Sequence, residues 1–354
     1  ALMIKTDWKI FIEKIGILAI TLMLVPSVST ASSPGGKSDI TVLKNGDRVT
    51  GEVIKQEASL LEFNTDTMGR VYIEWRFISE IISNKSHSVE TVDGVRWLGK
   101  LEKPETGDHI AVNTANGLME FHAQDVVSIW PVQATFWNKV DLDVSMGIDY
   151  SKSTDIFNSN LAVDFEHTTD DRLTQASLRS DITIQNSGDD QNRNQLQISH
   201  QYLLAKGRFR SLNGSLDGND ALGINLRISA GAGIGQYFLK TNRQWLSLSG
   251  GLLATNEYPA EGDTQTNLEA VGAVRYRYFR YAEPERKFDT TLSVFPSVTD
   301  WGRVRLDLRS TFKLEFFKNL FWAMEFYASH DTDPVSIDAE KTDYGVITSL
   351  GWSN

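Results

Sequence analysis

From about residue 138 onward, the chain alternates apolar and polar residues over long stretches. In 221–240 every second residue is apolar or small, ending near Phe238: Leu222, Ile224, Leu226, Ile228, Ala230, Ala232 and Ile234. Alternation of this length predicts a β-strand with one apolar and one polar face. Each strand residue rises about 3.3 Å, so this strand is longer than an ordinary globular one. Such strands are typical of transmembrane β-barrels, whose outer face meets lipid.

Twelve strands of this kind are predicted, at 138–150, 158–168, 173–185, 193–204, 207–217, 222–239, 243–255, 265–281, 286–297, 301–316, 320–331 and 341–353. Connections after even-numbered strands are mostly tight, whereas those after odd-numbered strands include longer polar loops. This asymmetry is typical of outer-membrane barrels. Lipocalin-like barrels and β-sandwiches are the soluble alternatives, but they seldom sustain twelve long strands. The predicted fold is all-β, with a 12-stranded antiparallel transmembrane β-barrel over 137–354.

The N-terminal 38 residues have the pattern of a secretory signal and a linker. Basic residues precede the apolar run 15–25, and small residues at 29–31 provide a cleavage site. The run is short for a bilayer span, so we predict a cleaved signal peptide at 1–31, with an uncleaved anchor as the alternative. Residues 32–38, SSPGGKS, read as a flexible linker.

Residues 39–131 contain an internal repeat. A shift of 48 residues aligns 40–82 with 89–130 and places Gly46 on Gly94. Asn45-Gly46 and Asp93-Gly94 are hairpin-turn dipeptides. Each copy therefore reads as four or five short strands with one helical turn, at 76–78 or 123–125, and resembles an SH3-like or Sm-like small barrel. Such barrels often bind RNA, but these copies lack a basic, aromatic-rich surface, so a periplasmic packing or protein-binding role is favoured.

The composition limits the kinds of partner and chemistry that we expect for this protein. The formal net charge of −11 argues against a nucleic-acid partner. The absence of cysteine excludes disulfides, thiolate zinc sites and a thiol nucleophile. We expect outer-membrane lipid, the barrel-insertion machinery and a periplasmic protein as partners, and no cofactor or metal.

Charged side chains on the polar face of the strands are assigned to the barrel lumen. The first three strands supply an acidic wall: Asp141, Asp143, Asp149, Asp164, Glu166 and Asp181. Strands six, eight and ten supply a basic wall, with Glu269, Asp307 and Glu315 among its residues: Arg227, Arg275, Arg277, Arg303, Arg305, Arg309 and Lys313. In a 12-stranded barrel, strand n faces strand n+6, so the walls oppose each other. They would either guide small polar solutes or close the lumen with ion pairs, and the second interpretation is favoured.

The C-terminal half resembles the salt-stress-induced outer-membrane proteins, an uncharacterised family of Gram-negative bacteria. The resemblance lies in LRISAGAGIGQYF (226–238), WLSLSGGLLATNE (245–257) and DPVSIDAEKTDYGVITSLGW (333–352). It implies an outer-membrane β-barrel and carries over no catalytic residues. Barrels of this kind usually end with an aromatic residue, whereas Trp352 is followed here by two more residues.

Enzymatic chemistry has weak support in the sequence. An outer-membrane lipid hydrolase would need a serine and a histidine within hydrogen-bond reach. His200 is the candidate base, but Ser199 points to the opposite face, as Ser329 does from His330. Gly231, Gly233 and Gly235 lie inside a strand, with no helix following to form a phosphate loop. We therefore expect no enzyme, and a role in envelope or salt stress that is structural or a narrow passage for small polar solutes. The alternative is an assembly factor that binds proteins through its periplasmic module.

Overall fold

The computed structural model describes residues 37–132, 139–151, 156–169, 171–185, 190–281, 284–317, 320–334 and 340–352. The signal peptide predicted at 1–31 and most of the linker 32–38 lie outside the described residues. Among the described residues, no helix has the length and apolar character needed to cross a membrane.

The N-terminal module is a nine-stranded sheet with the order β4-β3-β2-β1-β5-β6-β7-β8. β9 pairs with both β2 and β5 and so curls the sheet on itself. The elements are β1 (Asp39–Leu43), β2 (Arg48–Glu57), β3 (Leu60–Asn64), β4 (Arg70–Glu74), η1 (Trp75–Phe77), β5 (Ile78–Thr91), β6 (Arg96–Glu102), β7 (His109–Thr114), β8 (Gly117–His122), η2 (Ala123–Asp125) and β9 (Val126–Pro131). The predicted small β-barrel module is confirmed.

The sequence repeat is visible in the module as two equivalent halves. The 3-10 helices η1 and η2 occupy equivalent positions and confirm the predicted helical turns. Trp75 begins η1, and its indole Nε1 donates a 2.6 Å hydrogen bond to the carbonyl of Ala123, which begins η2. The side chains of Phe63, Ile78 and Ile129 are fully buried in the core. The two halves therefore share one hydrophobic core.

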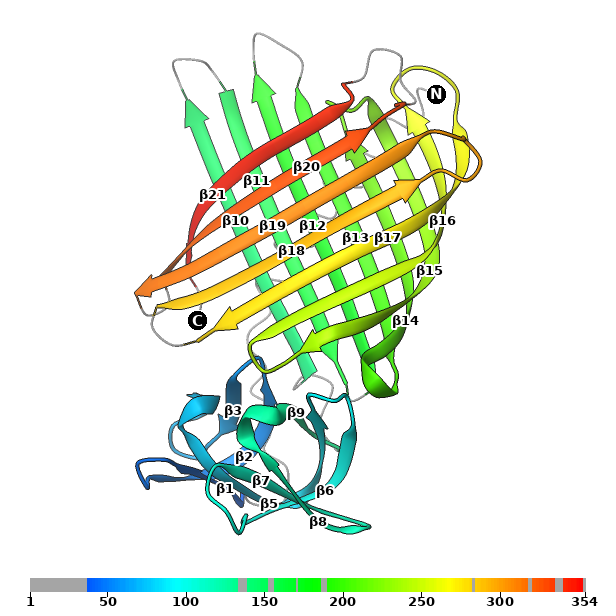
Figure 1. Ribbon diagram of the computed structural model, residues 1–354. Helices are drawn as coiled ribbons and strands as arrows, with labels where there is room; N and C mark the ends of the chain where they lie inside the picture. Colours follow the sequence, from blue (N-terminus) through cyan, green and yellow to red (C-terminus); the bar gives the residue numbers. More distant parts are fainter. Residues whose placement is uncertain are drawn as a thin grey trace. The chain divides into compact units, whose positions relative to one another are not determined.

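The C-terminal region is a 12-stranded antiparallel sheet in which strands follow one another in chain order (Figure 1). The strands are β10 (Val140–Ser151), β11 (Ile156–Thr168), β12 (Arg172–Gln185), β13 (Gln191–Leu203), β14 (Arg208–Asn219), β15 (Ile224–Lys240), β16 (Gln244–Pro259), β17 (Gln265–Arg280), β18 (Glu285–Pro296), β19 (Val304–Phe317), β20 (Leu320–Asp331) and β21 (Thr342–Trp352). One further 3-10 turn, η4 (Ala205–Gly207), precedes β14. All twelve predicted strands are confirmed, with boundaries within a few residues.

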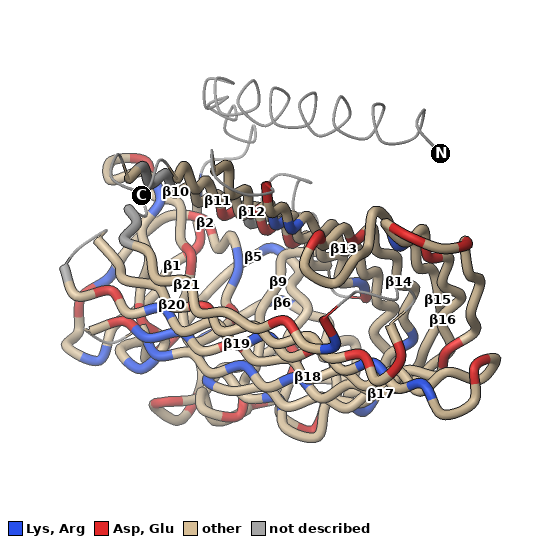
Figure 2. The backbone as a smooth tube through the Cα atoms, turned by 90° about the horizontal axis from the view of Figure 1, so that it is seen from above, with Lys and Arg blue, Asp and Glu red and all other residues tan. Residues whose placement is uncertain are grey.

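The sheet curls into a near-closed barrel. Viewed from above, β10 to β13 lie along one side and β17 to β21 along the other (Figure 2). Within the described residues, β10 and β21 do not pair with each other. Turns that follow β11, β13, β15, β17 and β19 are short and define the short-turn end, whereas the opposite end carries the longer loops.

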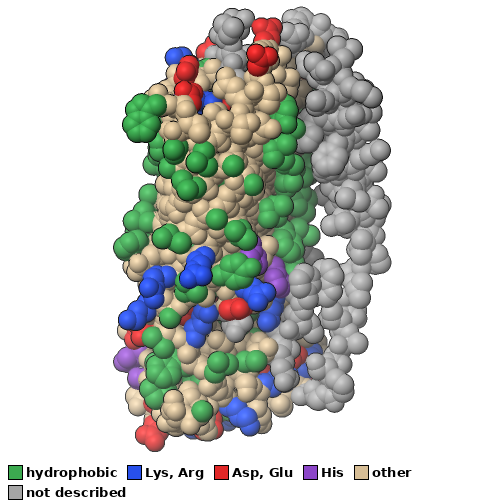
Figure 3. All heavy atoms as spheres, turned by 90° about the vertical axis from the view of Figure 1, so that its right-hand side faces the viewer, with side chains coloured by type: hydrophobic (Ala, Val, Ile, Leu, Met, Phe, Trp, Pro, Cys, Tyr) green, Lys and Arg blue, Asp and Glu red, His purple; other side chains and the backbone are tan. Residues whose placement is uncertain are grey.

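The outer face of the barrel is apolar. Ile234 is 68% exposed and Val346 is 63% exposed, so neither side chain is packed in a hydrophobic core. Other exposed apolar side chains lie on β10 and on β12 to β18: Leu142, Val144, Met146, Ile184, Ile198, Leu212, Ile228, Leu248, Leu252, Val274 and Leu292. Figure 3 shows this apolar surface on one face. A continuous apolar exterior fits the hydrocarbon of a bilayer.

The alternation in β15 breaks at its beginning. A register shift between Ile224 and Leu226 inserts one unpaired residue into the strand. Leu222 and Ile224 are consequently buried, whereas Ile228 is exposed. The prediction that Leu222 and Ile224 share the lipid-facing side is wrong, because the bulge reverses the faces there.

The glycines of β15 make room for neighbouring side chains. A Cβ atom on Gly235 would overlap the ring of Phe209 and lie 2.7 Å from the carbonyl oxygen of Leu248. Phe209 lies directly opposite Gly235 on the adjacent strand β14 and is buried. The glycine thus accommodates a ring from its neighbouring strand.

We expect Gly235→Val to destabilise the barrel by about 1–3 kcal/mol, because the added side chain overpacks the space of Phe209. The folded fraction, read from heat-modifiable migration in gels across a urea series, measures the effect. Gly272→Val is the matched control, since a Cβ at Gly272 meets nothing within 4 Å. Equal urea midpoints for the two variants would contradict the packing role.

Candidate functional site

The lumen carries a layer of polar contacts near the short-turn end. Arg275 of β17 donates two hydrogen bonds to Asp289 of β18, at 3.1 and 2.7 Å. Its third guanidinium nitrogen reaches Gln175 of β12 at 2.9 Å. Arg277 lies 3.1 Å from Asp289 and 3.8 Å from Glu166 of β11. Since β17 is far from β11 and β12 in the sheet order, these contacts cross the lumen.

A second layer lies near the middle of the strands. Arg179 of β12 binds both carboxylate oxygens of Asp164, at 2.9 and 2.8 Å, and its Nε lies 3.8 Å from Glu325 of β20. Arg309 of β19 lies 3.3 Å from Glu325 and donates a 2.6 Å hydrogen bond to Gln195 of β13. Glu325 therefore bridges two arginines from different sides of the barrel.

A third layer, here called the loop-end cluster, consists of Arg227, Glu257, Glu269, Arg303, Arg305 and Asp331. Arg303 donates to Asp331 at 3.0 Å and to Glu257 at 2.7 Å. Arg227 pairs with the same Glu257 and lies 3.9 Å from Asp331. Arg305 binds Glu269 through two hydrogen bonds of 2.7 and 2.6 Å. All six side chains are buried, so each charge depends on these partners.

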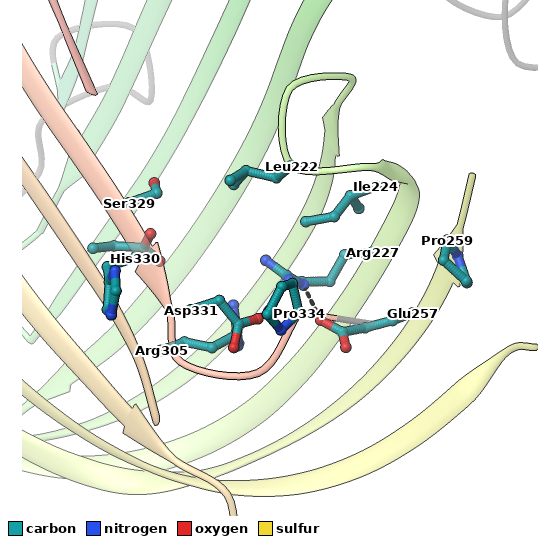
Figure 4. Close-up of a pocket in the computed structure, with 11 residues that line it drawn as sticks. Leu222, Ile224, Arg227, Glu257, Pro259, Arg305, Ser329, His330, Asp331 and Pro334 are labelled. Carbon is teal, nitrogen blue, oxygen red and sulfur yellow. Dashed lines mark hydrogen bonds and ion pairs between the residues drawn. The ribbon is translucent and has the colours of Figure 1, made fainter. Parts of the chain in front are cut away.

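A recess opens beside the loop-end cluster. It has about 420 Å³ of empty space, part of it open to solvent. Figure 4 shows Arg227 and Glu257 joined on one side, with Asp331 and Arg305 nearby. Leu222 and Ile224, turned inward by the β15 bulge, form its apolar wall. The recess therefore combines an apolar wall with charges that already have partners.

The remaining predicted lumen residues take more varied positions. Asp181 lies opposite Arg193 on the neighbouring strand. Lys313 stands over the ring of Phe321 at 3.8 Å. Asp143 is exposed and lies opposite Asp164 in the register of β10 and β11. The side chains of Asp141 and Asp149 lie outside the described residues.

The sequence placed Glu269, the partner of Arg305, among the basic residues, but the other carboxylates that neutralise the basic wall were missed. Glu257, Asp289, Glu325 and Asp331 are all ion-paired with its arginines. Two of them were detectable, because Arg227 lies opposite Glu257 and Arg277 lies opposite Asp289 in adjacent strands. The basic wall thus contains its own acids, and the two walls are less segregated than predicted.

The histidines considered for catalysis contact threonine hydroxyls and not a serine. His200 contacts the hydroxyl of Thr174 at 2.8 Å and meets the ring of Tyr202 edge to face, with ring centroids 4.7 Å apart. Ser199 bonds instead to Asn213 at 2.9 Å. His330 contacts Thr342 at 2.8 Å. Among the described residues, no group of three or more His, Asp or Glu side chains is arranged to hold a metal ion.

Comparisons with known proteins bear on the barrel region. A family model described as "Protein of unknown function, DUF481" matches residues 137–353. A solved structure, "NanC porin structure in rhombohedral crystal form", is similar with 10% sequence identity and a TM-score of 0.39, covering 60% of this chain and 100% of that chain. No curated protein matches the chain significantly.

We expect Glu257→Gln to destabilise the barrel by about 3–5 kcal/mol, because it leaves two buried guanidinium groups to share Asp331. Urea unfolding in detergent, followed by tryptophan fluorescence, measures the change. Glu261→Gln removes the same charge from an exposed site on the following loop and serves as the control. An unfolding curve for Glu257→Gln that matches this control would show that the pairing contributes nothing.

Proposed function

This chain belongs to the DUF481 family, described as a protein of unknown function, and on that premise we propose that it is an outer-membrane β-barrel with a filled polar lumen. In this proposal the barrel has no open diffusion pore. It contributes to the integrity of the envelope and passes small polar solutes only when its side chains rearrange. The role in envelope or salt stress rests on the sequence resemblance described above.

The observation that carries the proposal is the set of contacts across the lumen. Arg275 with Gln175, and Arg309 with Gln195, join strands that are far apart in the sheet. Ionic contacts run beside these hydrogen bonds in the same layers. Interior side chains can fill small barrels, whereas the wider barrels of porins leave an aqueous channel. Three layers of contacts at successive depths favour the filled lumen.

The orientation follows from the strand count and the turns. With an even number of strands, both ends of the barrel lie at the short-turn end. Short turns face the periplasm in bacterial outer-membrane barrels. The N-terminal module, which precedes β10 in the chain, would therefore belong to the periplasm. This supports the sequence-based localisation of a membrane barrel with a periplasmic module.

Conductance through planar bilayers tests the filled lumen. The unmodified chain should insert without discrete conductance steps. The double variant Arg275→Ala/Arg309→Ala removes one cross-lumen contact in each of two layers and should produce steps. Lys341→Ala, which changes an exposed cation outside the lumen, is the control and should stay silent. Discrete steps from the unmodified chain would contradict the proposal.

A second candidate function, protein binding by the module, has its own support. β4 and β8 are the two ends of the strand order in the module sheet. Tyr72 on β4 is 57% exposed, and Leu118 on β8 is 45% exposed. An edge strand with exposed apolar side chains is a template for an added strand. We propose that a periplasmic protein pairs with one of these edges.

Co-purification from envelope extracts tests this second function. A protein bound at the edges should be lost on deletion of 39–131 and weakened at least several-fold by Tyr72→Ser with Leu118→Ser. The deletion should leave the barrel heat-modifiable. Phe238→Ser, a change of an exposed aromatic residue on the barrel, is the control. A partner retained by the edge double variant would refute binding at β4 and β8.

A further inference from the structure

A belt of exposed cations lies on the outside of the barrel at its short-turn end, from β12 to β18. We propose that this basic belt binds the phosphate groups of anionic phospholipids in the adjoining leaflet. The inference rests on the proposed function, since it requires the barrel to span a membrane. The belt consists of Arg172, Lys206, Arg208, Arg210, Arg243, Arg280 and Arg286.

Strand register places the cations of the belt that lie in strands on the lipid-facing side, whereas Lys206 and Arg243 lie in short turns. Arg210 of β14 lies opposite Ile234 of β15, which is one of the most exposed apolar residues of the outer face. Arg280 lies on the same face of β17 as Val274, which is also exposed and lies six residues earlier. The guanidinium groups therefore continue the apolar outer face toward the periplasmic end. Figure 3 shows Lys and Arg side chains gathered beside this apolar surface.

Most of the belt lacks a protein counter-ion. Arg172 pairs with the exposed Asp171 at 3.3 Å. Within the described residues, none of the other six cations forms an ion pair. This contrasts with the arginines of the loop-end cluster, all of which have carboxylate partners. Because no carboxylate of the described residues neutralises these six cations, they are open to anions supplied from outside the chain.

The position of one pair of arginines in the register indicates a shared anion. Arg280 of β17 and Arg286 of β18 lie opposite each other in the register, and both are exposed. Like charges in this position repel and destabilise the pairing of the two strands. A phosphate between them would reverse that effect, because guanidinium groups match phosphate oxygens with two parallel hydrogen bonds. The register thus places two exposed arginines side by side on the outer surface, as a shared phosphate site requires.

The aromatic side chain beside the belt and the acidic charges at the loop end of the barrel both favour a lipid headgroup as the ligand of the belt. Arg172 lies 5.8 Å from the ring of Tyr202, an exposed aromatic residue of the kind that lines membrane interfaces. At the loop end, the exposed described charges are mostly acidic: Asp190, Asp220, Glu261, Asp263, Asp333 and Glu340, with Lys341 as a cation. A free phosphate in solution would have no reason to prefer the edge of the apolar surface. The belt therefore fits the anionic headgroups of one leaflet.

Native mass spectrometry of the full chain in detergent, supplied with equal phosphatidylglycerol and phosphatidylcholine, tests the inference. We expect retained phosphatidylglycerol to exceed phosphatidylcholine. Each cation near a membrane surface contributes about five-fold in affinity, so Arg280→Gln/Arg286→Gln should reduce the preference about 25-fold. Added salt should weaken it as well. Arg48→Gln/Lys341→Gln removes the same charge from exposed positions outside the belt and should retain the preference.

The outcomes separate this inference from the proposed function. Insertion into phosphatidylcholine vesicles, read as a heat-modifiable form, reports the membrane barrel without any anionic lipid. If the chain inserts but shows no preference for phosphatidylglycerol, or if the belt and control variants lose it equally, lipid binding by the belt is refuted and the barrel stands. If inorganic phosphate abolishes the preference at low concentration, the belt is a site for free phosphate and the lipid proposal fails. If the chain does not insert at all, both proposals fall.

Discussion

Burial of charge inside the barrel is the constraint on which the rest of this structure depends. A strand that crosses lipid sends every second side chain inward, so the polar half of twelve strands must share one narrow interior. Arg303 is only 2% exposed, and a guanidinium so buried needs charged partners. It finds them in Glu257 at the end of β16 and Asp331 at the end of β20. Ion pairing therefore joins strands through their side chains, in addition to the backbone hydrogen bonds of the sheet.

Much of the fold was predictable from the sequence because lipid imposes a simple rule on every strand. Alternation located all twelve strands, and the 48-residue repeat located both helical turns of the module. The failures were local. The bulge at Ile224 reverses the faces of β15 without any sign in the alternation, since both faces there carry apolar or neutral residues. Its effect is to close one side of the loop-end recess with Leu222 and Ile224.

The candidate site was harder to predict than the fold. Alternation assigns a side chain to the lumen, but its partner depends on strand register and on the way the sheet curls. Arg227 and Glu257 belong to one hairpin, so their pairing follows from local register. Arg179 and Glu325 lie on β12 and β20, and only the curvature of the sheet brings them within 3.8 Å. Contacts across the lumen are thus the part of the structure that sequence patterns describe least well.

Arginines in the lumen and arginines on the outer surface differ in burial and in their carboxylate partners. Arginines of the lumen are buried and neutralised by carboxylates of the same chain, which stabilises the interior without need of a ligand. Arginines at the short-turn end are exposed and mostly lack such partners, although the chain as a whole carries an excess of 11 acidic charges. The described carboxylate next to Arg286 in the chain, Glu285, pairs with Lys287 at 3.1 Å and not with Arg286. In the proposed lipid site, the headgroups at the edge of the apolar face supply the charge that balances these arginines.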